Sequence, residues 1–392
     1  MHKHLIMKSL RKLIDSIKPH FEPGAKLGAF HSTFEAFESM FFVPDKVTDR
    51  GCHIRDAIDL KRTMFTMIIA LVPALLFGMW NVGYQHSLAI GENWPLWPAF
   101  WFGLLKVLPI IVVSYAVGLS LEFAFAQKRK HQVNEGFLVS GLIIPMLMPV
   151  NVPLWMVALA TAFAVLIGKE AFGGTGMNIF NPALLARAFL FFAYPSRMSG
   201  EAAWVVPSEG MADAFTGATP LAHAAAGAMD KVASAYDLFM GFVPGSIGET
   251  STLAILIGAV LLVATGVASW KIMLSTVVGG MAAGYLFNAV GGSAYMTMPP
   301  WQHLLMGGFA FGAVFMATDP VTSAQTECGK WIYGFLVGFM ALLIRVLNPA
   351  YPEGMMLSIL LMNAFAPLID HIVVGTSIRR RMRRQPLSTT KN

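Results

Sequence analysis

Residues 98–124 read PAFWFGLLKVLPIIVVSYAVGLSLEFA and contain only two charged residues, Lys106 and Glu122. A helix needs roughly 20 predominantly apolar residues to cross the hydrocarbon core of a bilayer, so this stretch is long enough to span it. The whole chain agrees, because 56% of its 392 residues are hydrophobic and only 13% are charged. A soluble domain carries about 25% charged residues. We therefore expect an all-α polytopic membrane protein.

Similar apolar runs recur along the chain and predict about ten transmembrane helices. They lie near residues 64–82, 98–124, 137–150, 153–168, 179–194, 252–270, 272–290, 303–318, 330–347 and 354–374. The third and fifth runs are short and adjoin proline or glycine clusters, which favours broken or tilted helices. Ten spans could divide into two inverted five-helix repeats, as in many transporters. FNP (180–182) and TDP (318–320) both resemble a helix N-cap followed by proline, which supports such a repeat.

The distribution of charge predicts the orientation and the domains. Basic residues after the second, fourth, sixth and tenth runs fall on one side, which places both termini in the cytoplasm. The loop 195–250 holds six acidic and two basic residues and is expected to be periplasmic. The expected units are a cytoplasmic extension with an amphipathic helix and an aromatic-rich segment (1–60), a first membrane half (61–194), the periplasmic loop (195–250), a second membrane half (251–375) and a basic cytoplasmic tail (376–392).

Several classes of protein are excluded. Two cysteines, Cys52 and Cys328, cannot form a disulfide framework, and no CxxC pair offers a zinc or iron–sulfur site. The net charge of +6 would suit nucleic acid. The basic residues instead cluster beside apolar runs, as orientation in a bilayer requires. We expect lipid contacts and no nucleic-acid partner.

The segment GGTGMNIFNP (173–182) is the first candidate site. Closely spaced glycines let the backbone leave a helix, and such backbone at membrane depth must face protein or a cavity. Asparagines carry both donors and acceptors and would suit a flat polar heterocycle. A tight helix crossing with capping asparagines explains the segment equally well. The candidate contacts are Gly173, Gly174, Gly176, Asn178 and Asn181.

The segment DAFTGATP (213–220) is the second candidate. Thr219 precedes Pro220 and a helix-forming run, which predicts an N-cap. A helix N-terminus favours a phosphate. From the residues alone, simple capping is the more economical interpretation.

Acidic residues in or near apolar runs form the third set: Glu122, Asp319 and Asp370. Intramembrane acids are costly and are functional candidates by default. Their oxygens would suit a hard cation such as Na⁺. The alternative is a salt bridge or an acid at a span end. We expect Arg345 and Glu353, near the outer face, to form a structural pair.

A fourth, weaker signal is NEGFL (134–138), where a polar turn meets an apolar helix. Such a boundary would suit a quinone headgroup with its tail in lipid. The candidates are Glu135, Gly136 and Phe137.

These motifs resemble those of the B subunit of the bacterial Na⁺-translocating NADH:quinone reductases. The resemblance covers almost the whole chain from about residue 50. It is carried by VNEGF (133–137), KEAFGGTGMNIFNPALLARAFLFFAYP (169–195), TGATPLA (216–222), PGSIGETSTLA (244–254), GGFAFGAVFMATDP (307–320) and NPAYPEGMM (348–356). The related D subunit of Rnf-type electron-transport complexes shares the flavin motif. The extension of about 60 residues favours the quinone reductases.

The resemblance implies FMN bound to Thr219 through a phosphoester. The family pattern D-x-x-[ST]-G-A-T is matched by Asp213, Thr216, Gly217, Ala218 and Thr219. It also implies riboflavin against 173–182, with Asn178 and Asn181 bonded to its ring, and a quinone site near 133–137. The three acids would then affect Na⁺ transport.

The function implied is that of a redox subunit of a Na⁺-pumping NADH:ubiquinone oxidoreductase in the bacterial inner membrane. Electrons would pass from FMN through riboflavin to ubiquinone. The sequence has neither a nicotinamide-binding fold nor iron–sulfur ligands. The expected partners are therefore an NADH-oxidising flavin/iron–sulfur subunit, a periplasmic flavin subunit and other subunits of the complex. The alternatives are a flavinylated subunit of an Rnf-type complex, or a non-redox channel or secondary transporter.

Overall fold

The computed structural model describes residues 11, 14–21, 28, 34, 51–52, 60–129, 136–200, 203–207, 217–348, 351 and 353–384. Regular structure in these residues is helical, and they contain no strand. The expected all-α fold is confirmed.

Six helices within the described ranges are long and apolar enough to cross a membrane. They are α3 (Leu60–Ala89), α4 (Leu96–Arg129), α6 (Leu154–Leu166, extended by a turn and the 3₁₀ helix Glu170–Phe172), α12 (Trp270–Val290), α15 (Glu327–Leu347) and α16 (Met355–Arg384). Three apolar helices are shorter: α5 (Phe137–Met146), α7 (Pro182–Ala193) and α11 (Thr252–Ala264). Short helices α8 (Pro195–Met198), α9 (Pro220–Ala225) and α10 (Ala235–Met240) lie in the predicted periplasmic loop.

The predicted span 303–318 is not one helix. It comprises α13 (Pro300–Leu305), α14 (Phe309–Phe311) and a π-helical turn, η6 (Gly312–Met316). The break follows α13, where Met306 is extended and Gly307 has a φ of +62°. The third and fifth runs are short helices of 10 and 12 residues, as predicted.

The two proline motifs are only partly as expected. Asn181 is the N-cap of α7, and its side chain accepts hydrogen bonds from two backbone N–H groups. No helix begins at Pro320, because Asp319 caps a single turn and α15 begins at Glu327. The motifs therefore precede non-equivalent helices, the fifth of the first half and the fourth of the second. Their predicted equivalence is wrong.

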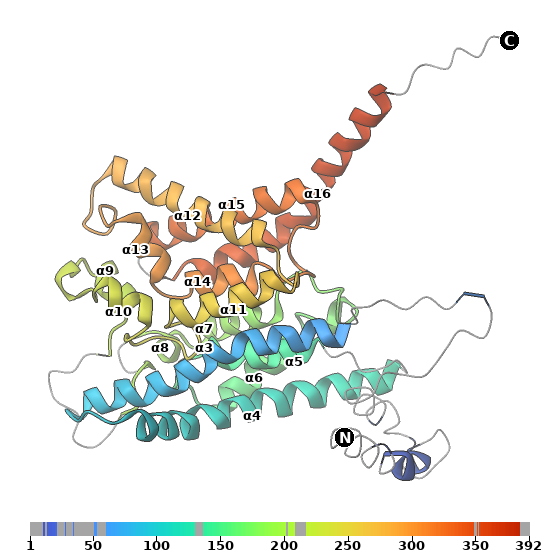
Figure 1. Ribbon diagram of the computed structural model, residues 1–392, viewed down its shortest axis with the longest axis horizontal. Helices are drawn as coiled ribbons and strands as arrows, with labels where there is room; N and C mark the ends of the chain where they lie inside the picture. Colours follow the sequence, from blue (N-terminus) through green and yellow to red (C-terminus); the bar gives the residue numbers. More distant parts are fainter. Residues whose placement is uncertain are drawn as a thin grey trace.

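Glycines bring long helices into close contact. Figure 1 shows α3 beside α4, and α12 beside α15 on the opposite side of the bundle. A Cβ atom on Gly103 would lie 1.7 Å from the carbonyl oxygen of Met79, and one on Gly338 would lie 1.9 Å from that of Thr276. Without a strong hydrophobic drive inside lipid, such close backbone packing holds helices together.

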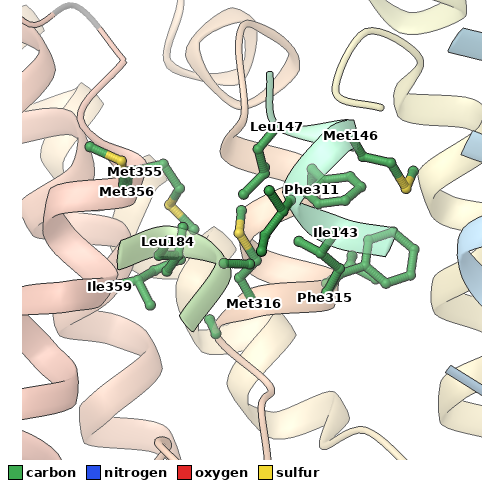
Figure 2. Packing of buried hydrophobic residues seen from close by; sticks show 14 of the residues in the cluster. Ile143, Met146, Leu147, Leu184, Phe311, Phe315, Met316, Met355, Met356 and Ile359 are labelled. Atoms are coloured by element: carbon green, nitrogen blue, oxygen red, sulfur yellow. The ribbon is translucent and has the colours of Figure 1, made fainter. Parts of the chain in front are cut away.

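The core lies where α5, α7, η6 and α16 converge. Figure 2 shows the side chains that fill it, all of them buried: Ile143, Met146, Leu147, Leu184, Phe311, Phe315, Met316, Met355, Met356 and Ile359. Short and broken helices therefore meet at the centre of the protein, flanked by the long ones. The α9 and α10 helices lie at one end, and the last turns of α16 project from the other (Figure 1).

Little of the N-terminal extension is described. Residues 11 and 14–17 are helical and are followed by the 3₁₀ helix η1 (Lys18–His20), as part of the predicted amphipathic helix requires. The rings of Phe21 and Phe34 stack with their centroids 4.8 Å apart. At the other terminus, α16 continues through the predicted boundary at residue 375 to Arg384.

Candidate functional site

Two cavities lie near the two ends of the bundle. The Asn181 cavity, with about 730 Å³ of empty space partly open to solvent, is lined by the start of α3, the start of α5, residues 169–182 and the loop 318–321. The Thr219 cavity, of about 750 Å³, is lined by parts of α7, residues 219–221, residues 243–250 and segments near 306 and 351.

The α3 and α7 helices relate the two cavities. Met67 of α3 lines the Asn181 cavity. Asn81, about 21 Å further along the same helix, donates a hydrogen bond from Nδ2 to the carbonyl of Val243, which lines the Thr219 cavity (3.0 Å). The α7 helix has Asn181 at its start in the first cavity and Arg187 in the second. A single short helix therefore connects the walls of both cavities.

The Asn181 cavity brings together residues that the sequence placed in three separate candidate sites. Asn178 and Asn181 come from the glycine-rich segment, Gly136 from the predicted quinone segment and Asp319 from the predicted cation set. These residues are distant in sequence, so only the fold shows that they share one cavity.

The glycine-rich segment has the backbone that its composition predicts. Gly173, Gly174 and Gly176 have φ angles of +120°, +106° and +89°, which residues with a Cβ rarely adopt. The turn places the hydroxyl of Thr175 in the cavity wall, buried and without a hydrogen-bond partner among the described residues. Buried polar groups are normally paired, so this hydroxyl is available to a bound polar ligand.

The two asparagines have different roles. Asn181 Oδ1 accepts from the N–H groups of Ala183 and Leu184 (3.0 and 3.3 Å), while Nδ2 donates to Asp319 Oδ2 (3.2 Å). Asn178 Nδ2 donates only locally, to the carbonyl of Phe180 (3.0 Å). Asn181 is therefore committed to capping α7 and holding Asp319.

Asp319 has no cationic partner among the described residues. Its Oδ1 accepts from the N–H of Val321 (3.1 Å), and its Oδ2 accepts from Thr322 Oγ1 (2.9 Å) and from Asn181. The carboxylate therefore borders the cavity with its charge stabilised only by neutral donors.

Glu122, in contrast, forms an ion pair with Lys169. The side chains are only 4% and 5% exposed. Lys169 lines the Asn181 cavity and Glu122 lies behind it. A second pair, Arg129 Nη1 to Glu170 Oε2 (2.7 Å), follows directly along the chain. For Glu122 the structure thus favours the salt bridge that the sequence left as an alternative.

Asp370 and the predicted quinone residues are placed differently from one another. Asp370, on α16, accepts hydrogen bonds from Gln325 and Thr326 and does not line the cavity.

The predicted quinone residues lie in different surroundings. Phe137 is 1% exposed, and its ring packs edge-on against Tyr115 in the core. Glu135 lies outside the described residues. Of the two quinone candidates that the structure describes, Gly136 lines the cavity and Phe137 does not.

In the second cavity, Thr219 is the N-cap of α9, as predicted. Its Oγ1 accepts from the N–H of Ala222 (3.2 Å), and the residue is half-buried. Because α9 has only six residues, its dipole would attract a phosphate less than the sequence suggested. Gly217 and Ala218 are buried beside it, while Asp213 and Thr216 lie outside the described residues.

A buried ionic network forms one wall of the Thr219 cavity. Arg187 donates to Glu249 Oε1 (2.7 Å), to Ser246 Oγ (3.2 Å) and to Glu353 Oε2 (2.6 Å). Burial raises the pKa of Glu353 to about 7, although Arg187 opposes the shift. The Thr250 hydroxyl in the same wall is buried and has no partner within the described part of the chain.

The predicted structural pair of Arg345 and Glu353 is present only through the main chain of Glu353. Arg345 donates to the main-chain carbonyls of His303, Met306 and Glu353, and the carboxylate of Glu353 binds Arg187 instead. Proximity in sequence suggested the pair, but α7 brings a second arginine to the same carboxylate.

Comparisons with known proteins identify the family. A family described as NQR2, RnfD, RnfE matches residues 47–379. The chain belongs to this family. A protein of Chromohalobacter salexigens, named as the B subunit of a Na(+)-translocating NADH-quinone reductase, is 48% identical over 96% of each chain. Proteins with the same name from Stutzerimonas stutzeri and Pseudomonas aeruginosa LESB58 are 46% and 45% identical over 96% of this chain and 99% of their own.

Sequence reasoning missed several wall residues of this family member: Lys169, Thr175, Arg187 and Thr250. One available signal was the charge of Arg187, the only ionisable residue in PALLARAFLFFA (182–193). Intramembrane charges default to functional candidates, and the same test applied to α7 would have selected it.

Proposed function

We propose that this chain is the membrane redox subunit of a Na⁺-translocating NADH:ubiquinone oxidoreductase. Electrons pass from FMN joined to Thr219, through riboflavin in the Asn181 cavity, to ubiquinone, coupled to Na⁺ export. The supporting observation is that Thr219, the last residue of the flavin motif, lines the Thr219 cavity. The α7 helix connects this cavity to the Asn181 cavity, which Asn178 and Asp319 also line. The names of the relatives support the same function.

The complex lies in the bacterial inner membrane, with both termini of this chain in the cytoplasm. Its partners are an NADH-oxidising flavin/iron–sulfur subunit, a periplasmic flavin subunit and the remaining subunits, since nothing in this sequence would oxidise NADH. The membrane lipid surrounds the long apolar helices.

The residues that line the Thr219 cavity suit a flavin phosphoester. Thr219 offers a half-buried hydroxyl as the ester oxygen, and the rings of Phe191, Trp204 and Tyr351 supply apolar wall. The unpartnered Thr250 hydroxyl can bond a polar ring atom. When bound, FMN supplies electron-transfer chemistry, while the protein determines its position and its electrostatic surroundings.

The Asn181 cavity fits a non-phosphorylated flavin beside a cation path. Thr175 and Asn178 offer a hydroxyl and an amide to a ring or a ribityl chain. Asp319 adds a carboxylate without a cationic partner among the described residues. The lack of a side chain at Gly136 lets the start of α5 pack against Thr175, because a Cβ there would lie 2.6 Å from Thr175 Cγ2. The quinone headgroup would approach this cavity beside Gly136, the residue of the predicted quinone segment (Glu135, Gly136 and Phe137) that lines it.

The two rival functions make different predictions. A flavinylated Rnf-type subunit would also carry FMN, but the end-to-end similarity to the relatives from quinone reductases, which includes most of the N-terminal extension, favours the quinone reductase. A non-redox channel or secondary transporter would carry no flavin. The unpartnered threonine in each cavity favours bound ligands over a simple pore.

The FMN claim is tested by Thr219→Ala in the purified complex. The wild-type subunit should fluoresce under ultraviolet light on a denaturing gel, and mass spectrometry should find one FMN phosphoester on the Thr219 peptide. The variant should be dark. Ser234→Ala is the matched control, because Ser234 also caps a short helix of the same loop but lies outside the motif. A dark wild-type band from flavinylating cells would contradict the proposal.

The riboflavin claim is tested by acid extraction of the purified complex. One non-phosphorylated flavin per complex is expected, and Asn178→Ala should lower its content while leaving the covalent flavin on Thr219 unchanged. Complete absence of riboflavin from active complex would remove this assignment.

A further inference from the structure

The loop 317–326, which carries Asp319, is bonded directly to α16 at its far end and is connected to α16 through Asn181 at its near end. It connects η6 to α15 and borders the Asn181 cavity through residues 318–321. Two polar residues of α16 make these connections: Asp370 bonds the loop itself, and Asn363 contacts Asn181, whose side chain bonds Asp319. They are seven residues apart and so share one helix face, about 10 Å from each other.

Asp370 holds the far end of the loop. Its Oδ2 accepts from the N–H of Gln325 (2.7 Å), and its Oδ1 accepts from both the N–H and the hydroxyl of Thr326 (3.0 and 2.6 Å). Thr326 is in turn the N-cap of α15, bonded to the N–H of Gly329 (3.1 Å). One carboxylate thus fixes the last residue of the loop and the start of the next helix.

Asn363 holds the near end through Asn181. The Asn363 amide lies 2.8 Å from Tyr333 Oη. The orientation that satisfies all of its neighbours has the amide oxygen accepting from the N–H of Asn181 (3.2 Å) and the amide nitrogen donating to Tyr333 Oη and to the carbonyl of Ile359 (3.2 Å). Asn181 then donates from Nδ2 to Asp319 (3.2 Å). Asn363 and Tyr333 are 1% and 0% exposed, so this chain of bonds is shielded from solvent.

We propose that Asp370 and Asn363 are positioning residues through which α16 fixes the carboxylate of Asp319 at the cavity, and that Asp370 does not itself bind the transported cation. On this inference Asp370 would act on cation transport through the loop, by way of its bonds to Gln325 and Thr326. The functional part of this inference rests on the proposed role of the Asn181 cavity.

The hydrogen bonds of Asp370 are those of a residue that caps the N-terminus of a helix. Both of its oxygens already accept from N–H or O–H donors, which point their positive ends toward the carboxylate. A cation would have to displace these donors. The carboxylate also lies at the N-terminus of the 21-residue α15, where its charge is stabilised.

The absence of a side chain at Gly329 makes this approach feasible. A Cβ atom there would lie 2.6 Å from Asp370 Oδ1 and 2.4 Å from Thr326 Oγ1. The third residue of α15 therefore leaves room for the carboxylate. This is the geometry of an anchor between helix and loop.

The test uses the intact complex with Asp370→Ala, Asp370→Asn, Thr326→Val and Thr326→Ser. Hydrogen exchange of peptides covering residues 317–326 reports the anchor directly, without reference to activity. Asp370→Ala should accelerate exchange at Gln325 and Thr326 about tenfold, the effect of losing one hydrogen bond to a charged group. Thr326→Val should accelerate exchange in the same peptides, while Thr326→Ser, which keeps the hydroxyl, should fall near wild type. Asp370→Asn keeps one acceptor oxygen but turns an amide N–H₂ group toward the remaining donor, so its exchange should fall between that of wild type and that of Asp370→Ala.

Activity against Na⁺ concentration gives the functional readout. Asp370→Ala and Thr326→Val should raise the half-saturating Na⁺ concentration by similar factors, about 2–30-fold, the range over which remote residues change coupling. The matched control is Thr376→Val, also on α16, whose hydroxyl bonds only within its own helix (2.8 Å to the carbonyl of Ile372). It should leave both readouts unchanged.

Two results would overturn the inference. One is unchanged exchange of 317–326 in Asp370→Ala. The other is a loss of Na⁺ response in Asp370→Asn as severe as in Asp370→Ala, with none in Thr326→Val, because a ligand needs the charge and an anchor needs the acceptor. Faster exchange with an unchanged Na⁺ response would support the anchor and count against the proposed Na⁺ role of Asp319.

Discussion

Replacing Lys169 by methionine should destabilise the protein strongly, because it leaves the buried carboxylate of Glu122 without its ammonium partner. Opposite unit charges 4 Å apart attract by about 4 kcal/mol at an effective dielectric constant of 20. Removing one member of a buried pair costs about 3–5 kcal/mol, since an uncompensated charge remains. The carboxylate of Glu170 lies near enough to repel Glu122 and adds to this penalty.

The double variant Lys169→Met/Glu122→Gln should recover most of that loss. Replacing both members of a buried pair is often neutral, because neither charge has to be desolvated. We expect the double variant to lie within about 1 kcal/mol of wild type, so that adding Glu122→Gln recovers about 2–4 kcal/mol of the stability lost in Lys169→Met.

The assay is thermal melting of the purified complex, followed by the signal of this subunit. In domains of 150–250 residues, 1 kcal/mol shifts the melting temperature by about 2–4 °C, so Lys169→Met should lower it by roughly 6–20 °C. Lys271→Met is the matched control, since Lys271 also pairs with a glutamate but lies at the exposed surface. It should leave the melting temperature nearly unchanged.

The same variants separate structure from transport. If Glu122 is the structural partner of Lys169, the double variant keeps a normal response to Na⁺. A single Lys169→Met variant as stable as wild type, or a double variant no better than the single one, would refute the reasoning. A stable double variant that has lost its Na⁺ response would instead indicate that Glu122 takes part in cation transport.

Two further predictions follow from packing and from protonation. Gly338→Leu should abolish accumulation of folded protein in the membrane, because even a Cβ there would lie 1.9 Å from the carbonyl oxygen of Thr276. Gly375→Ala is the control and should accumulate normally, since no atom lies within 4 Å of the new methyl group. Equal levels of the two variants would contradict this packing. Burial raises the pKa of Glu353 from 4.5 to about 7, so its contribution to stability is complete below about pH 4.5 and is lost as the pH rises through 7. The melting temperature measured between pH 5 and 8 should therefore fall less in Glu353→Gln than in wild type, and parallel profiles would argue against a proton on this residue.

Much of the architecture could be predicted because it depends on local properties. Hydropathy located the apolar helices, and the caps Asn181 and Thr219 were visible as polar residues before proline. The break at Gly307 was missed, because the flanking residues remain apolar and hydropathy does not report φ angles. The equivalence of the FNP and TDP motifs was wrong for a related reason. Pro320 is followed by a turn, and the local sequence did not show that α15 begins only at Glu327.

The sequence predicted which residue types the site contains, but not which of them pair with one another. The acids were correctly singled out as costly, yet the sequence did not show that Glu122 binds Lys169, 47 residues away, or that the Glu353 carboxylate binds Arg187 rather than Arg345. Such pairs depend on which helices pack together, and spacing along one helix carries no information about that. The flavin motif was evident only through its resemblance to a family.

The sequence by itself determined that this chain is a bundle of membrane-spanning and short helices, because transfer of each segment out of water depends on that segment alone. Only the tertiary structure decided that Asn181 and Asp319 share a cavity, that α7 joins this cavity to that of Thr219, and that Asp370 of α16 bonds the far end of the loop that carries Asp319. The physical reason is that hydrogen bonds and ion pairs act over a few ångströms in space. Which groups come within that distance is settled by how the helices pack.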